Sequence, residues 1–204
     1  MPAFLDRRSL TLVAVVGLSL SVGALALVVN KAPSDARPAQ NVQPGDEGID
    51  GVVLLNSSGE QVRWGELTGR PRAVFFGFTN CPVICPVTVW QLINALDGIG
   101  DIAQDAEVNF VTVDPERDTP ERLRAYFGGF GNRVRAFSGE PKAIARIARA
   151  FDVTYHRMEG PNGTYAMDHT STVFLVDRSG HVVDVIAYDS PKDVIETRLR
   201  ALVR

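Results

Sequence analysis

Hydrophobic and polar residues follow one another along the chain in a pattern that predicts alternating strands and helices. Short apolar runs at residues 72–78 and 108–114 are typical of buried central strands. Apolar residues at helical spacing predict helices over residues 87–96, ended by Gly98, and over residues 141–151. Strands that alternate with helices indicate a mostly parallel sheet covered on both faces.

Further patterns complete the predicted fold. An N-terminal hairpin is expected at 52–55 and 61–63, and a second hairpin turns at 178–180. Two further strands are expected at 133–137 and 153–157. One further helix has Pro120 in its first turn and Asp118 or Thr119 as its cap, and the last helix is opened by Ser190 and Pro191. An antiparallel hairpin before a C-terminal helix points to an α/β fold of the thioredoxin-like type. We therefore expect a central mixed sheet flanked by helices.

The N-terminal region has a different composition. Residues 10–29 carry no charge, and twenty helical residues span about 30 Å, the thickness of a bilayer core. They predict one transmembrane anchor, with residues 1–9 in the cytoplasm because two arginines precede the run. A cleaved signal peptide is the alternative, since residues 24–26 read Ala-Leu-Ala. Residues 30–47 have linker composition, which leaves residues 48–204 as the folded domain.

Charge and export narrow the functional classes. The formal net charge is −3, and no Lys/Arg-rich run indicates a nucleic-acid surface. An apolar run that starts so early leaves no room for an organelle transit peptide. We expect a single-pass protein of the bacterial plasma membrane, with its soluble domain on the periplasmic side. A cysteine pair is free to oxidise there unless something reduces it.

Both cysteines lie just after the first buried run, and each is followed by proline. In a helical turn Cys81 and Cys85 lie on one face, about 6 Å apart at Cα, which permits a disulfide or a shared metal ion. We expect an exposed helix start, with the regular helix beginning at Pro86 and its dipole stabilising the thiolates. A disulfide closing so short a loop stabilises little, which leaves a redox couple and a metal site.

A third donor distinguishes these two possibilities. His169 precedes the strand that enters the last hairpin, in a loop that faces the cysteines in a thioredoxin-like fold. Two thiolates and one imidazole favour Cu(I), with Zn(II) as a rival that wants a fourth ligand. We interpret His156 and His181 as solvated side chains. Met158 and Met167 are soft donors too, although Met more often fills gaps in a core.

Three motifs carry a family resemblance: FFGFTNCPVICP, VDPERDTPERLRAYF and YAMDHTSTVFLVDRSG, in this order. The chain resembles the Sco/SenC proteins over about residues 48–204. These are membrane-anchored, thioredoxin-like proteins of cytochrome c oxidase assembly. In that family the two motif cysteines and the distant histidine bind copper, and the cysteines also form a redox-active disulfide.

The resemblance implies the site and its partners. Cys81, Cys85 and His169 would bind copper as Cu(I) or Cu(II), and we expect one ion per protomer. The client would be the dinuclear copper site of cytochrome c oxidase subunit II, with other copper carriers or thiol reductants as further partners. Val83 departs from the family, which often has an acidic residue at that position.

The segment DPERDTP is also a family marker, and its residues are interpreted as structural. Asp114 ends a strand. Asp118 and Thr119 are expected to bind the first amides of the next helix. No chemistry is assigned to this segment.

Two functions stay open. The chain is primarily a metallochaperone, or it is an extracytoplasmic thiol–disulfide oxidoreductase in which Cys81 and Cys85 are catalytic. Redox enzymes of thioredoxin-like fold carry a proline that faces the dithiol, whereas residues 168–172 here read DHTST. The same sulfurs can serve both functions, and the missing proline favours copper. A peroxidase is disfavoured because the peroxiredoxin pattern Pro-x-x-x-Thr-x-x-Cys is absent.

Overall fold

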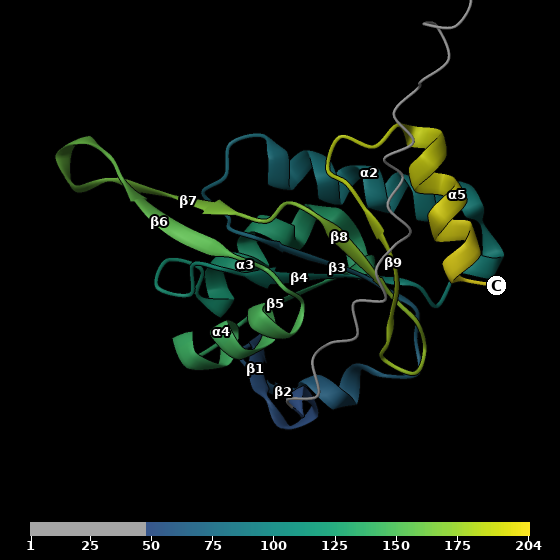
Figure 1. Ribbon diagram of the computed structural model, residues 1–204, viewed down its shortest axis with the longest axis horizontal. Helices are drawn as coiled ribbons and strands as arrows, with labels where there is room; N and C mark the ends of the chain where they lie inside the picture. The colour runs from purple at the N-terminus through teal and green to yellow at the C-terminus, as the bar shows by residue number, and fades with distance from the viewer. Residues whose placement is uncertain (1–47) are drawn as a thin grey trace, which may run out of the picture. The chain divides into compact units, whose positions relative to one another are not determined.

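Seven strands form one central sheet in the computed structural model, which describes residues 48–204 (Figure 1). The strands lie in the order β2-β1-β5-β4-β3-β8-β9. Their bounds are β1 Val53–Asn56, β2 Gln61–Arg63, β3 Arg72–Gly77, β4 Glu107–Thr112, β5 Val134–Ser138, β8 Val173–Val176 and β9 Val182–Ile186. The predicted anchor, its signal-peptide alternative and the linker lie outside the described residues.

The centre of the sheet is formed by the two apolar runs. Every residue of β3 and β4 is buried, and the strands pair in parallel with Phe75 opposite Phe110. The pair β4–β5 is also parallel, whereas the other four pairs are antiparallel. The α/β class with a mixed sheet is confirmed, but the mostly parallel pairing is wrong. The reason is that each hairpin adds antiparallel strands, one to β5 and the other to β3.

Helices cover both faces of the sheet. They are α2 Ile84–Ile99, α3 Pro120–Phe127, α4 Pro141–Ala150 and α5 Lys192–Leu202, with 3₁₀ turns at Ile49–Gly51, Trp64–Leu67, Asp101–Ala103, Gly128–Arg133 and Pro161–Gly163. Phe127 of α3 packs against Phe110 with ring centroids 4.7 Å apart, and on the other face Phe151, after α4, packs 5.5 Å from Phe76. Figure 1 shows α2 and α5 side by side. Within residues 48–204, no helix is long and apolar enough to cross a membrane.

A two-stranded arm, β6 Tyr155–Glu159 and β7 Tyr165–His169, forms a second sheet that projects from the body in Figure 1. The strands pair antiparallel, with Tyr155 opposite His169. The prediction that a strand near 153–157 extends the central alternation is therefore wrong. His169 ends a strand rather than lying in a loop, because its backbone pairs with β6.

Two helix boundaries show which local signals the chain uses. Thr119 caps α3, since its side chain accepts a hydrogen bond from the Arg122 amide at 3.3 Å. Helix α2 continues past Gly98 to Ile99 and is capped by Gly100, where the backbone adopts a φ of 81°. The predicted end at Gly98 is wrong because this glycine keeps helical geometry.

Gly77 allows helix α2 to approach the sheet closely. A Cβ atom at this position would lie 2.8 Å from a ring carbon of Phe110 and 2.9 Å from the sulfur of Cys85. Both separations are shorter than van der Waals contact, so a side chain here would displace buried neighbours. The missing side chain is what lets the second cysteine pack against β3.

We predict that Gly77→Ala lowers the free energy of unfolding by about 1–3 kcal/mol, because it overpacks the core. Gly98→Ala is the matched control. Its Cβ would meet no atom within 4 Å, and alanine should stabilise the helix by about 0.5–1 kcal/mol. Denaturant unfolding of both variants measures the difference, and equal stabilities would contradict the packing argument.

Candidate metal centre

The two cysteines lie where β3 passes into α2. The Cys81 amide donates to the Phe78 carbonyl at 3.2 Å, which closes the turn after the strand. The Cys85 amide then donates to the Cys81 sulfur at 3.5 Å. Both residues are free thiols. The first sulfur therefore accepts a hydrogen bond from an amide at the start of the helix, and the second is carried by the first helical turn.

The helix begins earlier than the sequence predicts. Its first residue is Ile84, its N-cap is Val83, and Pro86 stands third in the helix. The first backbone bond inside this turn runs from the Val87 amide to the Val83 carbonyl at 3.2 Å. The helix accommodates Pro86 at this position, because the first amides of a helix have no intrahelical acceptor and proline lacks only an amide hydrogen there.

The cysteines are buried rather than exposed. Cys81 is 9% exposed and Cys85 is fully buried. Burial raises the pKa of the Cys85 thiol above its ordinary value, and the nearby Cys81 sulfur adds to the effect. The predicted thiolate stabilisation is therefore wrong for Cys85, because desolvation outweighs the hydrogen bonding that favours the charged form. A metal ion bound here must displace the thiol proton.

His169 reaches this pair from the arm. Its Nε2 atom lies 3.9 Å from the Cys85 sulfur. Its Nδ1 atom lies 2.9 Å from the Thr170 carbonyl, which only accepts, so Nδ1 carries the hydrogen and Nε2 presents a lone pair toward the sulfur. The ring packs edge-on to Phe75 and Phe78, with centroids 6.2 and 5.8 Å away. The histidine is therefore fixed in both tautomer and orientation.

A buried carboxylate holds the loop that carries the first cysteine. Asp118 is fully buried and accepts hydrogen bonds from the Thr79 amide at 3.0 Å and hydroxyl at 2.5 Å, and from the Thr112 hydroxyl at 2.6 Å. Arg122 donates to the Thr79 hydroxyl at 2.6 Å and to the Asn80 side chain at 2.9 Å. These contacts fix the two residues that precede the cysteine.

The sequence does not reveal this brace. We expected Asp118 to bind helix amides with Thr119, but Thr119 alone caps α3 and Asp118 points into the protein. Burial raises the pKa of this carboxyl, although its three hydrogen bonds act in the opposite direction. One feature of the sequence nevertheless indicates that Asp118 has another role. A second capping residue beside Thr119 is redundant, which leaves the aspartate available for another contact.

A second set of contacts ties the arm to the body. The Tyr165 hydroxyl donates to Asp114 at 2.8 Å, and Arg117 donates to the Tyr165 carbonyl at 2.9 Å. Arg117 also pairs with Asp114, and its guanidinium carbon lies 3.5 Å from the centroid of the Tyr165 ring. Since Tyr165 begins the strand that ends in His169, these contacts position the histidine.

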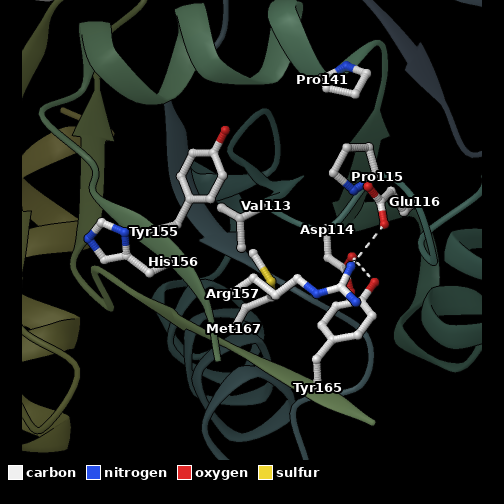
Figure 2. Close-up of a pocket in the computed structure, with 10 residues that line it drawn as sticks. All are labelled: Val113, Asp114, Pro115, Glu116, Pro141, Tyr155, His156, Arg157, Tyr165 and Met167. Atoms are coloured by element: carbon white, nitrogen blue, oxygen red, sulfur yellow. Dashed lines mark hydrogen bonds and ion pairs between the residues drawn. The ribbon is translucent and has the colours of Figure 1, made fainter. Parts of the chain in front are cut away.

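A pocket of about 300 Å³ lies between the arm and the loop after β4 (Figure 2). Met167 projects into it, while Arg157 crosses it to pair with Glu116 at 3.3 Å. The guanidinium carbon of Arg157 lies 3.7 Å from the centroid of the Tyr165 ring. Arg157 therefore fills part of the pocket and contacts both Glu116 and the Tyr165 ring. These contacts also hold the arm against the body.

The three predicted ligands lie close together, but their atoms do not yet form a finished coordination site. Among residues 48–204, no group of three or more His, Cys, Asp and Glu side chains is arranged to hold a metal ion as it stands. Cys81 accepts an amide hydrogen bond, and Cys85 is 3.9 Å from His169. Ligation by Cys81, Cys85 and His169 stays a prediction.

Two thiols at a helix start, with a histidine brought beside them by a separate hairpin, define a thioredoxin-like α/β protein with a candidate metal centre. The chain belongs to the SCO1/SenC family, whose model matches residues 48–204. The expected family is thereby confirmed.

Individual relatives agree with this assignment. The chain is 30% identical over 198 residues to an SCO2-like protein of Rickettsia felis, covering 94% of this chain and 97% of that one. It is 30% identical to the copper-bound structure of ScoI from Bradyrhizobium japonicum, with a TM-score of 0.67 and coverage of 74% and 96%. Copper-bound ScoI from Arabidopsis thaliana is 29% identical, with a TM-score of 0.71 and coverage of 76% and 98%.

We predict that Asp118→Ala destabilises the fold by about 2–4 kcal/mol, because it leaves buried threonine donors without an acceptor. Asp189→Ala, at an exposed position, should change stability by less than about 0.5 kcal/mol. Denaturant unfolding tests both values. The rate of thiol modification provides a second test, since a loosened loop should make the cysteines react faster in the Asp118 variant alone. Unchanged thiol reactivity would mean that Asp118 does not hold the loop.

Proposed function

We propose that this chain is a copper-binding metallochaperone whose ligands are Cys81, Cys85 and His169. One observation carries the proposal: an imidazole from a separate hairpin has its Nε2 atom 3.9 Å from the Cys85 sulfur. The Nδ1 hydrogen bond to the Thr170 carbonyl leaves Nε2 free to coordinate. The copper-bound relatives support the choice of metal.

The donor set suits Cu(I). Thiolates and imidazole are soft or borderline ligands, and three of them satisfy this ion. Zn(II) prefers four ligands and is less well served. Because the Cys85 thiol has a raised pKa, binding must release its proton, and copper affinity should therefore rise with pH. We expect one tightly bound ion per protomer, bound as Cu(I) or Cu(II).

Copper is the cargo of this protein, and exposure sets the order of its release. Cys81 is 9% exposed, whereas Cys85 is fully buried. His169 is half-buried, so an incoming ligand from a client reaches the ion on the side of Cys81 and His169 first, and the fully buried Cys85 holds it until the exchange is under way. This order follows from access alone and needs no change of oxidation state.

BsSco, a similar protein, is a member of the Sco family of cytochrome c oxidase assembly proteins, and we propose that this chain serves the same process. We propose that the client is the dinuclear copper site of oxidase subunit II, and that other copper carriers load the chain. We also propose a single-pass protein of the bacterial plasma membrane, with residues 48–204 on the periplasmic side. The uncharged run at residues 10–29 supports this location.

A second candidate is a thiol–disulfide oxidoreductase that reduces the client's cysteines. The amide of Cys85 donates to the sulfur of Cys81, so the two cysteines are already in contact, as a dithiol that forms a disulfide requires. In that reaction the two thiols give two electrons and two protons to the client's disulfide, and they become a disulfide themselves. The burial of Cys85 slows such an exchange and leaves copper binding as the better supported function.

We predict that anaerobic Cu(I) titration with a competing chelator gives one tight site in the wild-type chain. Cys81→Ser and Cys85→Ser should each weaken Cu(I) binding by more than about 100-fold. That loss exceeds the one expected for a residue that only orients a metal ligand. His169→Ala should weaken Cu(I) and Cu(II) binding, while His181→Ala, in the β8–β9 turn, should bind like wild type.

Two results would count against this scheme. If His169→Ala bound both oxidation states like wild type, the three-ligand set would be wrong. If the reduced, copper-free chain rapidly reduced an oxidised client peptide, the oxidoreductase function would gain support.

A further inference from the structure

Soft metal donors are concentrated in one small part of the chain. Apart from Met1, the chain has two cysteines, three histidines and two methionines. Two of these seven side chains are the cysteines of the α2 start. Four others belong to the β6–β7 arm: His156, Met158, Met167 and His169. The proposed centre uses only one of those four, so the other three remain to be explained.

The arm has two chemically different faces because successive strand side chains alternate. Met167 and His169 are half-buried on the face that turns toward the body. His156 and Met158 lie on the opposite face, which we call the outer face. In Figure 2 the His156 ring points away from Met167. Two donors of the same kinds therefore lie on each side of the arm.

Register places a carboxylate beside the outer-face pair. His156 is directly opposite Asp168, and Met158 is opposite the small residue Ala166. Residues two apart on one strand are separated by about 6.6–6.8 Å at Cα, and directly opposite residues by about 4.5–5.5 Å. The imidazole, the thioether and the carboxylate can therefore reach a single ion above the strands, with no large side chain in the way.

Packing does not account for these side chains. Met158 is 52% exposed, and His156 and Asp168 are also exposed. Within residues 48–204, none of the three makes a side-chain hydrogen bond or an ion pair. Met167, by contrast, is packed against the core. An exposed methionine beside an unpaired histidine is a poor gap filler but an available pair of metal ligands.

We propose that His156 and Met158, with Asp168 beside them, form a second and weaker Cu(I) site on the outer face of the arm. A thioether selects Cu(I), and imidazole is an accepted partner for it. This set has no thiolate, so it should hold the ion less tightly than Cys81 and Cys85 do. Exposure makes it accessible to a copper donor that cannot reach the buried sulfurs.

The location suits a capture site for copper on its way to the main centre. Asp168 is the residue before His169, and His156 follows Tyr155, which pairs with His169. The two sites therefore lie on opposite faces of the same pair of strands. Cu(I) would move from the weaker ligands to the stronger ones as an ion, by ligand exchange without any redox step. This role rests on the proposed function.

The test is anaerobic Cu(I) titration of the full-length chain with both cysteines replaced, Cys81→Ser and Cys85→Ser. Methionine methyl signals, labelled with ¹³C, report which sulfur binds. We expect one weak site, a shift of the Met158 methyl and an unchanged Met167 methyl. Adding Met158→Leu or His156→Asn should weaken this site about tenfold or more, whereas His181→Asn should leave it unchanged.

Each alternative result has a definite meaning. No Cu(I) binding by the cysteine-free chain would overturn the second site, while one tight ion in the wild type would still support the proposed function. A shift of Met167 instead of Met158 would also overturn it and assign binding to the inner face. If replacing the cysteines left the tight site intact, the proposed function would fail, but a Met158 shift would still support the outer-face site. The Met167 signal also reports whether each variant is folded.

Discussion

The carboxylate of Asp118 lies where the ends of β3 and β4 meet the start of α3, and the geometry of the cysteine loop depends on it. Moving a carboxylate out of water is costly unless donors replace the lost hydration. Thr79 and Thr112 supply three such donors, and Arg122 lies 3.8 Å away as a partly exposed counter-charge. The turn before Cys81 is therefore held by hydrogen bonds from side chains as well as by its backbone.

The same region shows how the fold limits the chemistry of the second cysteine. Gly77 provides the space into which the Cys85 sulfur packs, and Phe110 closes that space from β4. The sulfur therefore lies in an apolar setting that keeps it protonated, although a helix terminus is nearby. A cation that enters must compensate for the desolvated charge, and copper with its strong bonds to sulfur can do so.

Much of the fold follows from local patterns in the sequence. The continuous apolar runs in β3 and β4 are recognisable because both of their faces are buried, and the Pro120 helix because Thr119 is a good cap. The nearness of His169 to the cysteines follows from topology. What local patterns cannot show is long-range packing. The burial of Cys85 depends on a glycine eight residues earlier, and the brace at Asp118 depends on Thr79, 39 residues away.

The β6–β7 arm is the second feature that the hydrophobic pattern of the sequence does not predict. Its strands are short and largely exposed, so they lack the apolar period that identifies a central strand, and the sequence predicts a loop where β7 lies. The antiparallel pairing along both strands, from Tyr155 opposite His169 to Glu159 opposite Tyr165, together with the contacts of Tyr165, defines it as structure. The histidine is therefore part of an element that packs on the body through few residues.

This division means that the candidate centre is shared by two parts of the protein with different local stability. The sulfurs are buried with the core, whereas the imidazole belongs to a hairpin that is held in large part by Tyr165, Arg117 and Asp114. Such peripheral units open at a lower free-energy cost than the core. Of the three proposed ligands, the imidazole is therefore the one that can withdraw at the lower cost while the domain stays folded. In the proposed centre, movement of the arm and not of the cysteines would then set how firmly copper is held.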